Sequence, residues 1–213
     1  MKYKNYYKCA KQLYKNEKSG HDFSHIKRVL KHVKKIIKVE GGNEFLLTVA
    51  TLFHDVHRLL SNKQNRYVCA KESIEEVEKI LTPFNIEPKN LKQILFLIEN
   101  HENKDDPTIT NLELKILQDA DVLDAIGLIG LRRTKKYCKN KNIPRVNKNY
   151  SLNCKEYVPD IFPISTTHYV FRTMIPQGES METAMGKKLA KTKLKVLFNF
   201  VNKNIKKYNL KTN

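Results

Sequence analysis

A histidine and an aspartate stand side by side directly behind an apolar run. The run extends from Leu46 to Phe53, and His54 and Asp55 follow it. A helix that is apolar on most sides is usually buried, and a buried imidazole beside a buried carboxylate needs partners. A nitrogen donor and an oxygen donor offered together suit a divalent metal ion. We therefore expect the rest of the chain to supply further ligands and a phosphate-binding wall around this pair.

Two further residues complete a candidate ligand set. His25 begins an expected core helix, and Asp121 lies within the apolar segment 117–123. With His54 and Asp55 they offer two imidazoles and two carboxylates, a mixed set that suits Mn, Fe, Co, Ni, Zn or Mg better than a soft thiolate site does. Each residue alone has an ordinary explanation, because buried polar groups usually find hydrogen-bond or ion-pair partners.

Apolar residues at helical spacing place these residues on core helices. One stripe runs from Ile26 to Ile37, and its lysines face away: Lys27, Lys31, Lys34 and Lys38. Gly41 and Gly42 are expected to end this helix. Asn43 is expected to cap the helix that carries His54 and Asp55. Another helix should begin near Pro88 and end at His101.

The pattern as a whole predicts an all-α fold, a compact multi-helix bundle. No strand pattern exceeds a few residues, and residues 139–165 show no period and form a long irregular connection. At 213 residues the chain suits one domain. We expect a core over about 20–135 and a C-terminal helical cover over about 166–206.

The composition indicates which partners and which cellular compartment to expect. Lysine and arginine number 40 against 22 acidic residues, a net charge of +18 that favours anionic partners. A solvated lysine surface explains the charge better than a dedicated nucleic-acid face, because the lysines are spread along the chain. The four cysteines form no CxxC pair, and neither a signal peptide nor a membrane span is evident. We expect a cytoplasmic protein without a membrane partner.

Three motifs in order resemble those of the HD-domain metal-dependent phosphohydrolase superfamily. They are Gly20-His21-Asp22-Phe23-Ser24-His25, then Leu52-Phe53-His54-Asp55, then Asp119-Ala120-Asp121-Val122-Leu123-Asp124-Ala125-Ile126-Gly127. Within that superfamily the chain looks most like the small nucleotide-hydrolysing branch. The likeness covers about residues 20–192 and is weak over 139–165.

The resemblance places the metal ligands on His25, His54, Asp55 and Asp121. Other branches add two histidines, and this chain has Cys69 near one of those positions and His101 at the other. A mononuclear site is therefore the simpler expectation, with His101 free to touch the phosphate or its water.

The implied activity is hydrolysis of a phosphate ester or anhydride of a nucleotide by metal-bound water, with manganese among the suitable ions. A (deoxy)nucleoside phosphate is the expected substrate, and a phosphodiester is the alternative. The expected substrate contacts are Arg28, Arg58, Arg133 and Asp124. Arg58 replaces an acidic residue of some relatives, and it could bind phosphate or pair with a helix carboxylate.

Several residues are candidates for the general acid: His21, Asp22, His57, His101 and Asp119, while Asp55 serves the reaction from the ligand set. His21 is the better candidate for substrate contact if the helix already includes it, because it would then share a face with His25. His57 lies one turn from His54 and is expected to support it.

Two other functions remain open. The chain could be a nucleic-acid-binding module that keeps this scaffold without turnover, a hypothesis that the net charge of +18 favours. The metal could instead be structural, holding helices together. The presence of all four candidate ligands argues against the first, since a module without turnover is expected to lose at least one.

Overall fold

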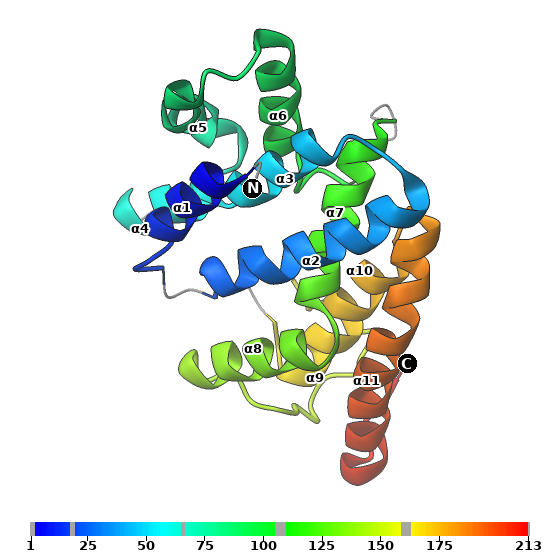
Figure 1. The fold of residues 1–213 in the computed structure, drawn as a ribbon. Helices are drawn as coiled ribbons and strands as arrows, with labels where there is room; N and C mark the ends of the chain where they lie inside the picture. The colour runs from blue at the N-terminus through cyan, green and yellow to red at the C-terminus, as the bar shows by residue number, and fades with distance from the viewer. Residues whose placement is uncertain (1–2, 18–19, 65–66, 105–109, 159–162, 213) are drawn as a thin grey trace. The chain divides into compact units, whose positions relative to one another are not determined.

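The protein is all-α in the computed structural model, which describes residues 3–17, 20–64, 67–104, 110–158 and 163–212 (Figure 1). No strand occurs within these ranges, so the predicted fold class is confirmed. The chain forms two compact units, Met1–Asp121 and Val122–Asn213. The predicted single domain stays a prediction.

The first unit is built around a buried central helix. Its helices and short turns are α1 (Lys4–Leu13), α2 (Phe23–Glu40), α3 (Glu44–Phe53), α4 (Val56–Gln64), η1 (Lys71–Ser73), α5 (Ile74–Leu81), η2 (Thr82–Phe84), α6 (Pro88–Asn100) and the start of α7 (Leu112–Ala125). Helix α3 contacts α1, α2 and α6, and every residue from Leu46 to Phe53 is buried. This burial explains why the run carries no polar face.

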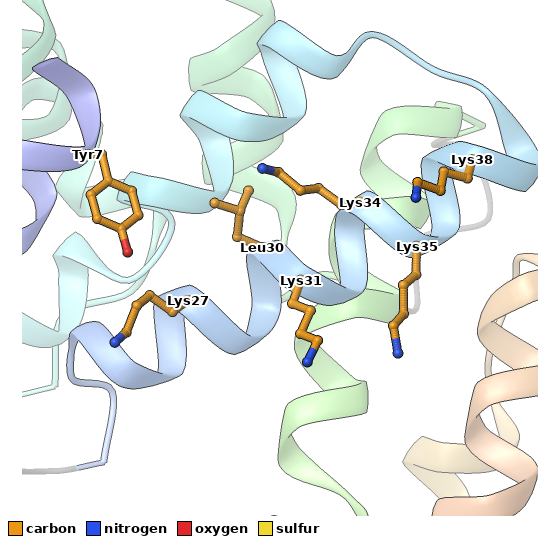
Figure 2. A pocket seen from close by; sticks show the side chains of 7 residues that line it. All are labelled: Tyr7, Lys27, Leu30, Lys31, Lys34, Lys35 and Lys38. Carbon is orange, nitrogen blue, oxygen red and sulfur yellow. The ribbon is translucent and has the colours of Figure 1, made fainter. Parts of the chain in front are cut away.

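Both ends of α2 follow the sequence signals. The Asp22 carboxylate accepts hydrogen bonds from the backbone N–H groups of Ser24 and His25, which caps the first turn. The helix ends at Glu40, and Gly41 follows with a φ of 78°, a conformation that suits glycine. The predicted outward lysines are exposed, as Figure 2 shows for Lys27, Lys31, Lys34 and Lys38.

The predicted cap of α3 is also present. The side chain of Asn43 accepts hydrogen bonds from the N–H groups of Phe45 and Leu46. The helix is shorter than expected, however, because it ends at Phe53. His54 and Asp55 lie in the turn that joins α3 to α4.

The second unit is a layer of helices around α11. It holds the end of α7, then α8 (Gly127–Asn140), α9 (Thr166–Tyr169), the π-helical turn η3 (Val170–Met174), α10 (Ile175–Glu179) and α11 (Ala184–Tyr208). Helix α11 contacts α8, α9 and α10, and buries Leu197 and Val201. Of the helices that the structure describes, none has the length and apolar character to cross a bilayer.

The connection predicted to be irregular over 139–165 starts later than expected, because residues 139 and 140 belong to α8. The rest of its described part, 141–158 and 163–165, contains no helix or strand. Its backbone is nevertheless anchored. The carbonyls of Pro144 and Arg145 accept hydrogen bonds from the N–H groups of Thr166 and Thr167. The Arg145 side chain also donates to Asn204 of α11. These hydrogen bonds satisfy main-chain groups that would be paired within a helix or sheet if the segment were regular.

Candidate metal centre

The turn after α3 fixes the orientation of His54. The residue is fully buried, and its Nδ1 lies 2.8 Å from the carbonyl oxygen of Thr51. A carbonyl can only accept, so Nδ1 carries the proton and Nε2 keeps its lone pair. The turn therefore presents the nitrogen that a metal ion requires.

The structure brings the four predicted ligands together within the first unit. The Nε2 atom of His25 lies 3.4 Å from Nε2 of His54, 3.1 Å from Oδ2 of Asp55 and 3.3 Å from Oδ1 of Asp121. Ligand atoms each about 2.1 Å from one ion lie about 3.0–3.4 Å apart at octahedral or tetrahedral angles. The three His25 distances therefore fit ligands of a single divalent ion. Nε2 of His54 lies 3.4 Å from Oδ2 of Asp55, within this range, and 3.8 Å from Oδ1 of Asp121, slightly beyond it.

The charges of the cluster favour a cation. Burial alone would raise the pKa of Asp55, but the charges of His54 and His21 and hydrogen bonds from His21 and His25 hold it well below its usual range. Hydrogen bonds from His25 and His54 likewise outweigh burial and keep the pKa of Asp121 well below its usual range. Burial lowers the pKa of His54, but the Asp55 and Asp121 charges outweigh it and raise that pKa. Two carboxylates thus stay ionised beside two imidazoles.

One side of the cluster is open. The side chains of His25, His54 and Asp55 are at most 3% exposed, whereas Asp121 is 32% exposed and His21 is 28% exposed. Closed coordination is typical of structural ions, and an accessible position is typical of catalytic ones. The exposure of His21 and Asp121 therefore argues against a purely structural site.

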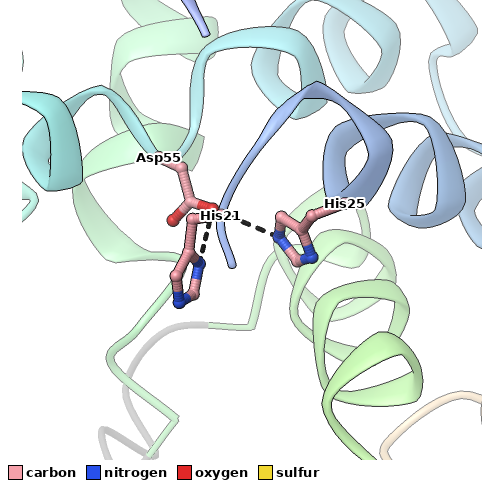
Figure 3. A group of neighbouring side chains, drawn as sticks. All are labelled: His21, His25 and Asp55. Carbon is pink, nitrogen blue, oxygen red and sulfur yellow. Dashed lines mark hydrogen bonds and ion pairs between the residues drawn. The ribbon is translucent and has the colours of Figure 1, made fainter. Parts of the chain in front are cut away.

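His21 reaches the cluster from outside the helix. Helix α2 begins at Phe23, so the predicted helical face shared by His21 and His25 is not formed. Instead the backbone N–H of His21 donates to Glu17, and its Nδ1 lies 2.9 Å from Oδ2 of Asp55. Figure 3 shows His21 and His25 both directed at this carboxylate, with the second nitrogen of His21 pointing away from it.

A second group of side chains lies beside the cluster. The Nδ1 atom of His57 lies 3.2 Å from the His54 carbonyl, and that of His101 lies 2.7 Å from the Ile98 carbonyl. Burial, with the neighbouring His54 charge, lowers the pKa of His101 to about 4. His101 is therefore neutral at physiological pH.

Glu102 connects this group to Arg58. Its Oε1 lies 3.4 Å from Nε2 of His57 and also binds the Arg58 guanidinium. Burial would raise the pKa of Glu102, but the His57 hydrogen bond and the Arg58 charge outweigh it and lower the pKa to about 2. The Nε atom of Arg58 lies 3.8 Å from Oδ1 of Asp55. Arg58 was expected either to bind phosphate or to pair with a carboxylate, and in this structure it pairs with the carboxylate of Glu102.

The other candidates in the first unit have partners of their own. Asp22 caps α2. Asp119 is fully buried, and its Oδ1 lies 3.4 Å from Nζ of Lys104. Arg28 donates to the hydroxyl of Ser24. Their predicted roles in catalysis or substrate binding stay predictions.

The remaining candidates pair with each other in the second unit. Asp124 is buried on α7, and its Oδ2 lies 3.1 Å from Nη1 of Arg133 on α8. This ion pair joins two successive helices. The predicted contact of both residues with substrate stays a prediction.

Sequence reasoning missed Glu102 and Glu17. Glu102 directly follows His101 at the end of α6, and Glu17 lies between α1 and α2. Neither falls in a helical pattern that would assign it to the core. An acid next to a candidate histidine was the available signal for Glu102. Cys69 belongs to no cluster of potential ligands among the described residues, and all four cysteines are free.

Comparison with known proteins identifies the domain. Residues 22–126 match the model of the HD domain family. The crystal structure of an HD-superfamily hydrolase from Bacillus thuringiensis is 25% identical, covers 98% of this chain and 97% of its own, and superposes with a TM-score of 0.75.

Bacillus subtilis YpgQ, an uncharacterized protein, is 32% identical over 122 residues, which are 55% of this chain and 57% of YpgQ. The crystal structure of YpgQ in complex with ADP has the same fold. Its TM-score is 0.70 at 22% identity, and the match covers 96% of this chain and 93% of that one.

Proposed function

Because the chain belongs to the HD-domain superfamily, we propose that it is a metal-dependent phosphohydrolase acting on a nucleotide. The observation that carries the proposal is the open cluster of His25, His54, Asp55 and Asp121, whose ligand atoms are spaced for one divalent ion. These four residues would hold the ion, and their mixed nitrogen and oxygen donors suit Mn, Co, Ni, Fe, Zn or Mg. When bound, such an ion lowers the pKa of water and polarises a phosphoryl oxygen.

Asp55 and His21 form the substrate-facing part of the proposed mechanism. Asp55 shares one oxygen between the ligand cluster and Nδ1 of His21, so it orients the His21 ring. Figure 3 shows the second nitrogen of His21 directed away from the Asp55 carboxylate, and the His21 side chain is 28% exposed. When both ring nitrogens carry a proton, Nε2 can donate a hydrogen bond to a phosphoryl oxygen or hand its proton to the leaving group.

His101 has a different role in the proposal. Its Nδ1 must donate to the Ile98 carbonyl, so Nε2 is an acceptor and can orient water through its lone pair. Asp119, held by Lys104, positions the helix that carries Asp121.

The charges around Glu102 favour one metal ion in the site over two. Glu102, His57 and His101 also offer closely spaced donor atoms, but the Arg58 guanidinium already neutralises Glu102. A second cation there would have to displace this partner or be repelled by it. Cys69 supplies no alternative ligand in the described structure.

Two observations support a nucleotide substrate. YpgQ has been crystallised in complex with ADP, and it shares this fold. The net charge of +18 also draws phosphorylated molecules toward the protein. Arg58 is 30% exposed at the edge of the cluster, and we assign it to binding the phosphate of the substrate. The four free thiols suit a reducing compartment, and we place the reaction in the cytoplasm.

Incubation with a nucleotide panel tests the proposal. Mono-, di- and triphosphates are incubated with Mn²⁺, Co²⁺, Ni²⁺ or Mg²⁺, and the products are separated by anion-exchange chromatography. Release of pyrophosphate or of phosphate identifies the bond that is cleaved. Asp55→Asn and Asp121→Asn should each lose at least about 100-fold in kcat/KM, since such losses accompany even outer-sphere changes at metal sites.

The matched control is Glu78→Gln, which removes one exposed acidic charge on α5 and should keep full activity. The proposal fails if no nucleotide is cleaved with any of the ions. It also fails if the two aspartate variants turn over as fast as the control.

A further inference from the structure

A groove lined by lysines runs along the outer side of α2. Its volume is about 460 Å³. It is lined by Tyr7 of α1 and by six residues of α2: Lys27, Leu30, Lys31, Lys34, Lys35 and Lys38. Figure 2 shows the five ammonium groups spread along successive turns of α2. We call these residues the lysine groove.

The lysine groove is separate from the metal centre. At 3.6 residues per turn, its five lysines fall within an arc of about 100°, whose centre lies about 130° around the axis of α2 from His25. His25 and Val29 are buried, whereas all five lysines are exposed. Changes to the groove therefore leave the ligand geometry intact.

The positive charge of the groove is not compensated within the described structure. None of its five lysines takes part in an ion pair between the residues that are described, and no carboxylate lines the groove. The nearest specific contact is that of Lys27, whose Nζ lies 5.9 Å from the centre of the Phe23 ring. Five like charges on one helical face repel one another, and a bound polyanion would relieve that repulsion.

Tyr7 adds an aromatic surface at the end of the groove. Its ring meets Phe23 edge to face with centroids 4.9 Å apart, and 36% of the residue is exposed. Three exposed lysines flank it on α1: Lys4, Lys8 and Lys11. An aromatic ring beside a line of cations is the combination that holds single-stranded nucleic acids, because bases stack while phosphates pair with lysines.

From these features we infer that the lysine groove binds single-stranded nucleic acid. Lysines one turn apart stand about 6 Å apart along the helix axis, so successive charges can follow an extended backbone. A membrane surface fits less well, because a helix that lies in a bilayer buries its apolar face in lipid, and the apolar face of α2 is buried in the protein core. Duplex DNA would leave Tyr7 without a base to stack on.

Fluorescence anisotropy with labelled oligothymidylate, in EDTA to prevent turnover, tests this inference. The quadruple variant Lys27→Gln, Lys31→Gln, Lys34→Gln, Lys38→Gln should bind at least tenfold more weakly. Its slope of log affinity against log salt should be shallower by about 3, given about 0.7 per lost phosphate contact. The matched control makes the same change at four exposed lysines of α11, Lys187, Lys188, Lys191 and Lys195, and should keep the slope.

Tyr7 provides an independent readout. Tyr7→Ala should weaken binding at least about fivefold, because one base stack is lost. Tyr7→Phe should bind like the wild type, and Tyr137→Ala, at another exposed tyrosine, is its control. Circular dichroism confirms that each variant is folded.

Equal losses in the α2 and α11 variants would overturn the inference, because binding would then follow net charge alone. It would equally be overturned if duplex DNA or phosphatidylserine vesicles bound more tightly than the single strand. Nucleotide hydrolysis by the α2 variant should match that of the wild type, so failure of this inference is distinguishable from failure of the proposed enzyme.

Discussion

The guanidinium of Arg58 is bound to the carboxylate of Glu102, a residue 44 positions away. The pair links α4, which follows the His54–Asp55 turn, to the end of α6. Because His57 also approaches Glu102, two side chains next to the ligand cluster, those of Arg58 and His57, share one carboxylate. Arg58 is therefore held at the edge of the cluster by a partner that the sequence motif does not include.

Two replacements of Arg58 should distinguish the contribution of its positive charge from that of its hydrogen-bond geometry. Arg58→Lys keeps the charge but cannot hold Glu102 while also lying near Asp55, because an ammonium has no fork of donors. We expect Arg58→Lys to lose about tenfold in kcat/KM and Arg58→Ala about 100-fold, as for a single donor to a developing charge. Steady-state kinetics on the best nucleotide measures both. Equal activity of Arg58→Ala and wild type would exclude Arg58 as a residue that binds the substrate phosphate.

Glu102 should contribute to stability in a pH-dependent way. Its pKa in the folded protein is about 2, below the ordinary value of 4.5, so folding favours the ionised form. The stability this provides is present above pH 4.5 and is lost as the pH falls toward 2. Glu102→Gln should lower the free energy of unfolding at pH 7 by about 1 kcal/mol, a modest value because the side chain is 30% exposed.

Urea unfolding of metal-free protein at several pH values measures this effect. The difference between wild type and Glu102→Gln should shrink between pH 4.5 and 2. Glu78→Gln, which removes an exposed charge, should show a difference near zero at pH 7. A Glu102→Gln deficit that stays constant on acidification would contradict the prediction.

His21 variants can tell which of its two nitrogens matters. His21→Asn keeps a donor at the position of Nδ1 for Asp55 and removes Nε2, whereas His21→Gln places its amide nearer to the position of Nε2. If Nε2 acts on substrate, kcat should fall by about 100-fold in His21→Asn, the lower limit for loss of a general acid. Metal affinity, measured by calorimetry with Mn²⁺, should stay unchanged in His21→Asn, which keeps the donor to Asp55. Full activity of His21→Asn would restrict the residue to orienting Asp55.

Divalent ions should stabilise the folded protein through the four-residue cluster. Ligand at 100 times its Kd adds about 2.7 kcal/mol, and for a chain of this size each kcal/mol raises Tm by about 2–4 °C. We expect Mn²⁺ added after EDTA treatment to raise Tm by about 5–10 °C on this basis. His54→Gln should abolish the rise, and Glu78→Gln should keep it. A rise that persists in His54→Gln would place the ion elsewhere.

The sequence predicted the helices around the site and the four side chains that the structure brings together, whereas their role as metal ligands stays a prediction. The apolar run before His54 and the capping residues Asp22 and Asn43 act locally, so their effects can be read from neighbouring residues. His25, Asp55 and Asp121 were assignable because their spacing along the chain matches a known order of motifs.

The contacts that join distant loops could not be predicted in the same way. Glu102 meets Arg58 only because α4 and the end of α6 approach each other, and no periodic pattern encodes that approach. His21 was expected on the helix, but Asp22 takes the capping position and leaves His21 outside α2. Its contact with Asp55 depends on the path of the chain before the cap.

Three histidines near the centre are supported in the same manner, each through Nδ1 and the carbonyl oxygen three residues earlier: His54 on Thr51, His57 on His54 and His101 on Ile98. The supporting atom belongs to the main chain, so replacing the side chain at position 51 or 98 does not remove it. The backbone carbonyl three residues earlier thus determines the tautomer of each ring, whatever side chain that residue carries. Substitutions at these two positions should therefore leave unchanged which nitrogen of His54 and of His101 keeps its lone pair.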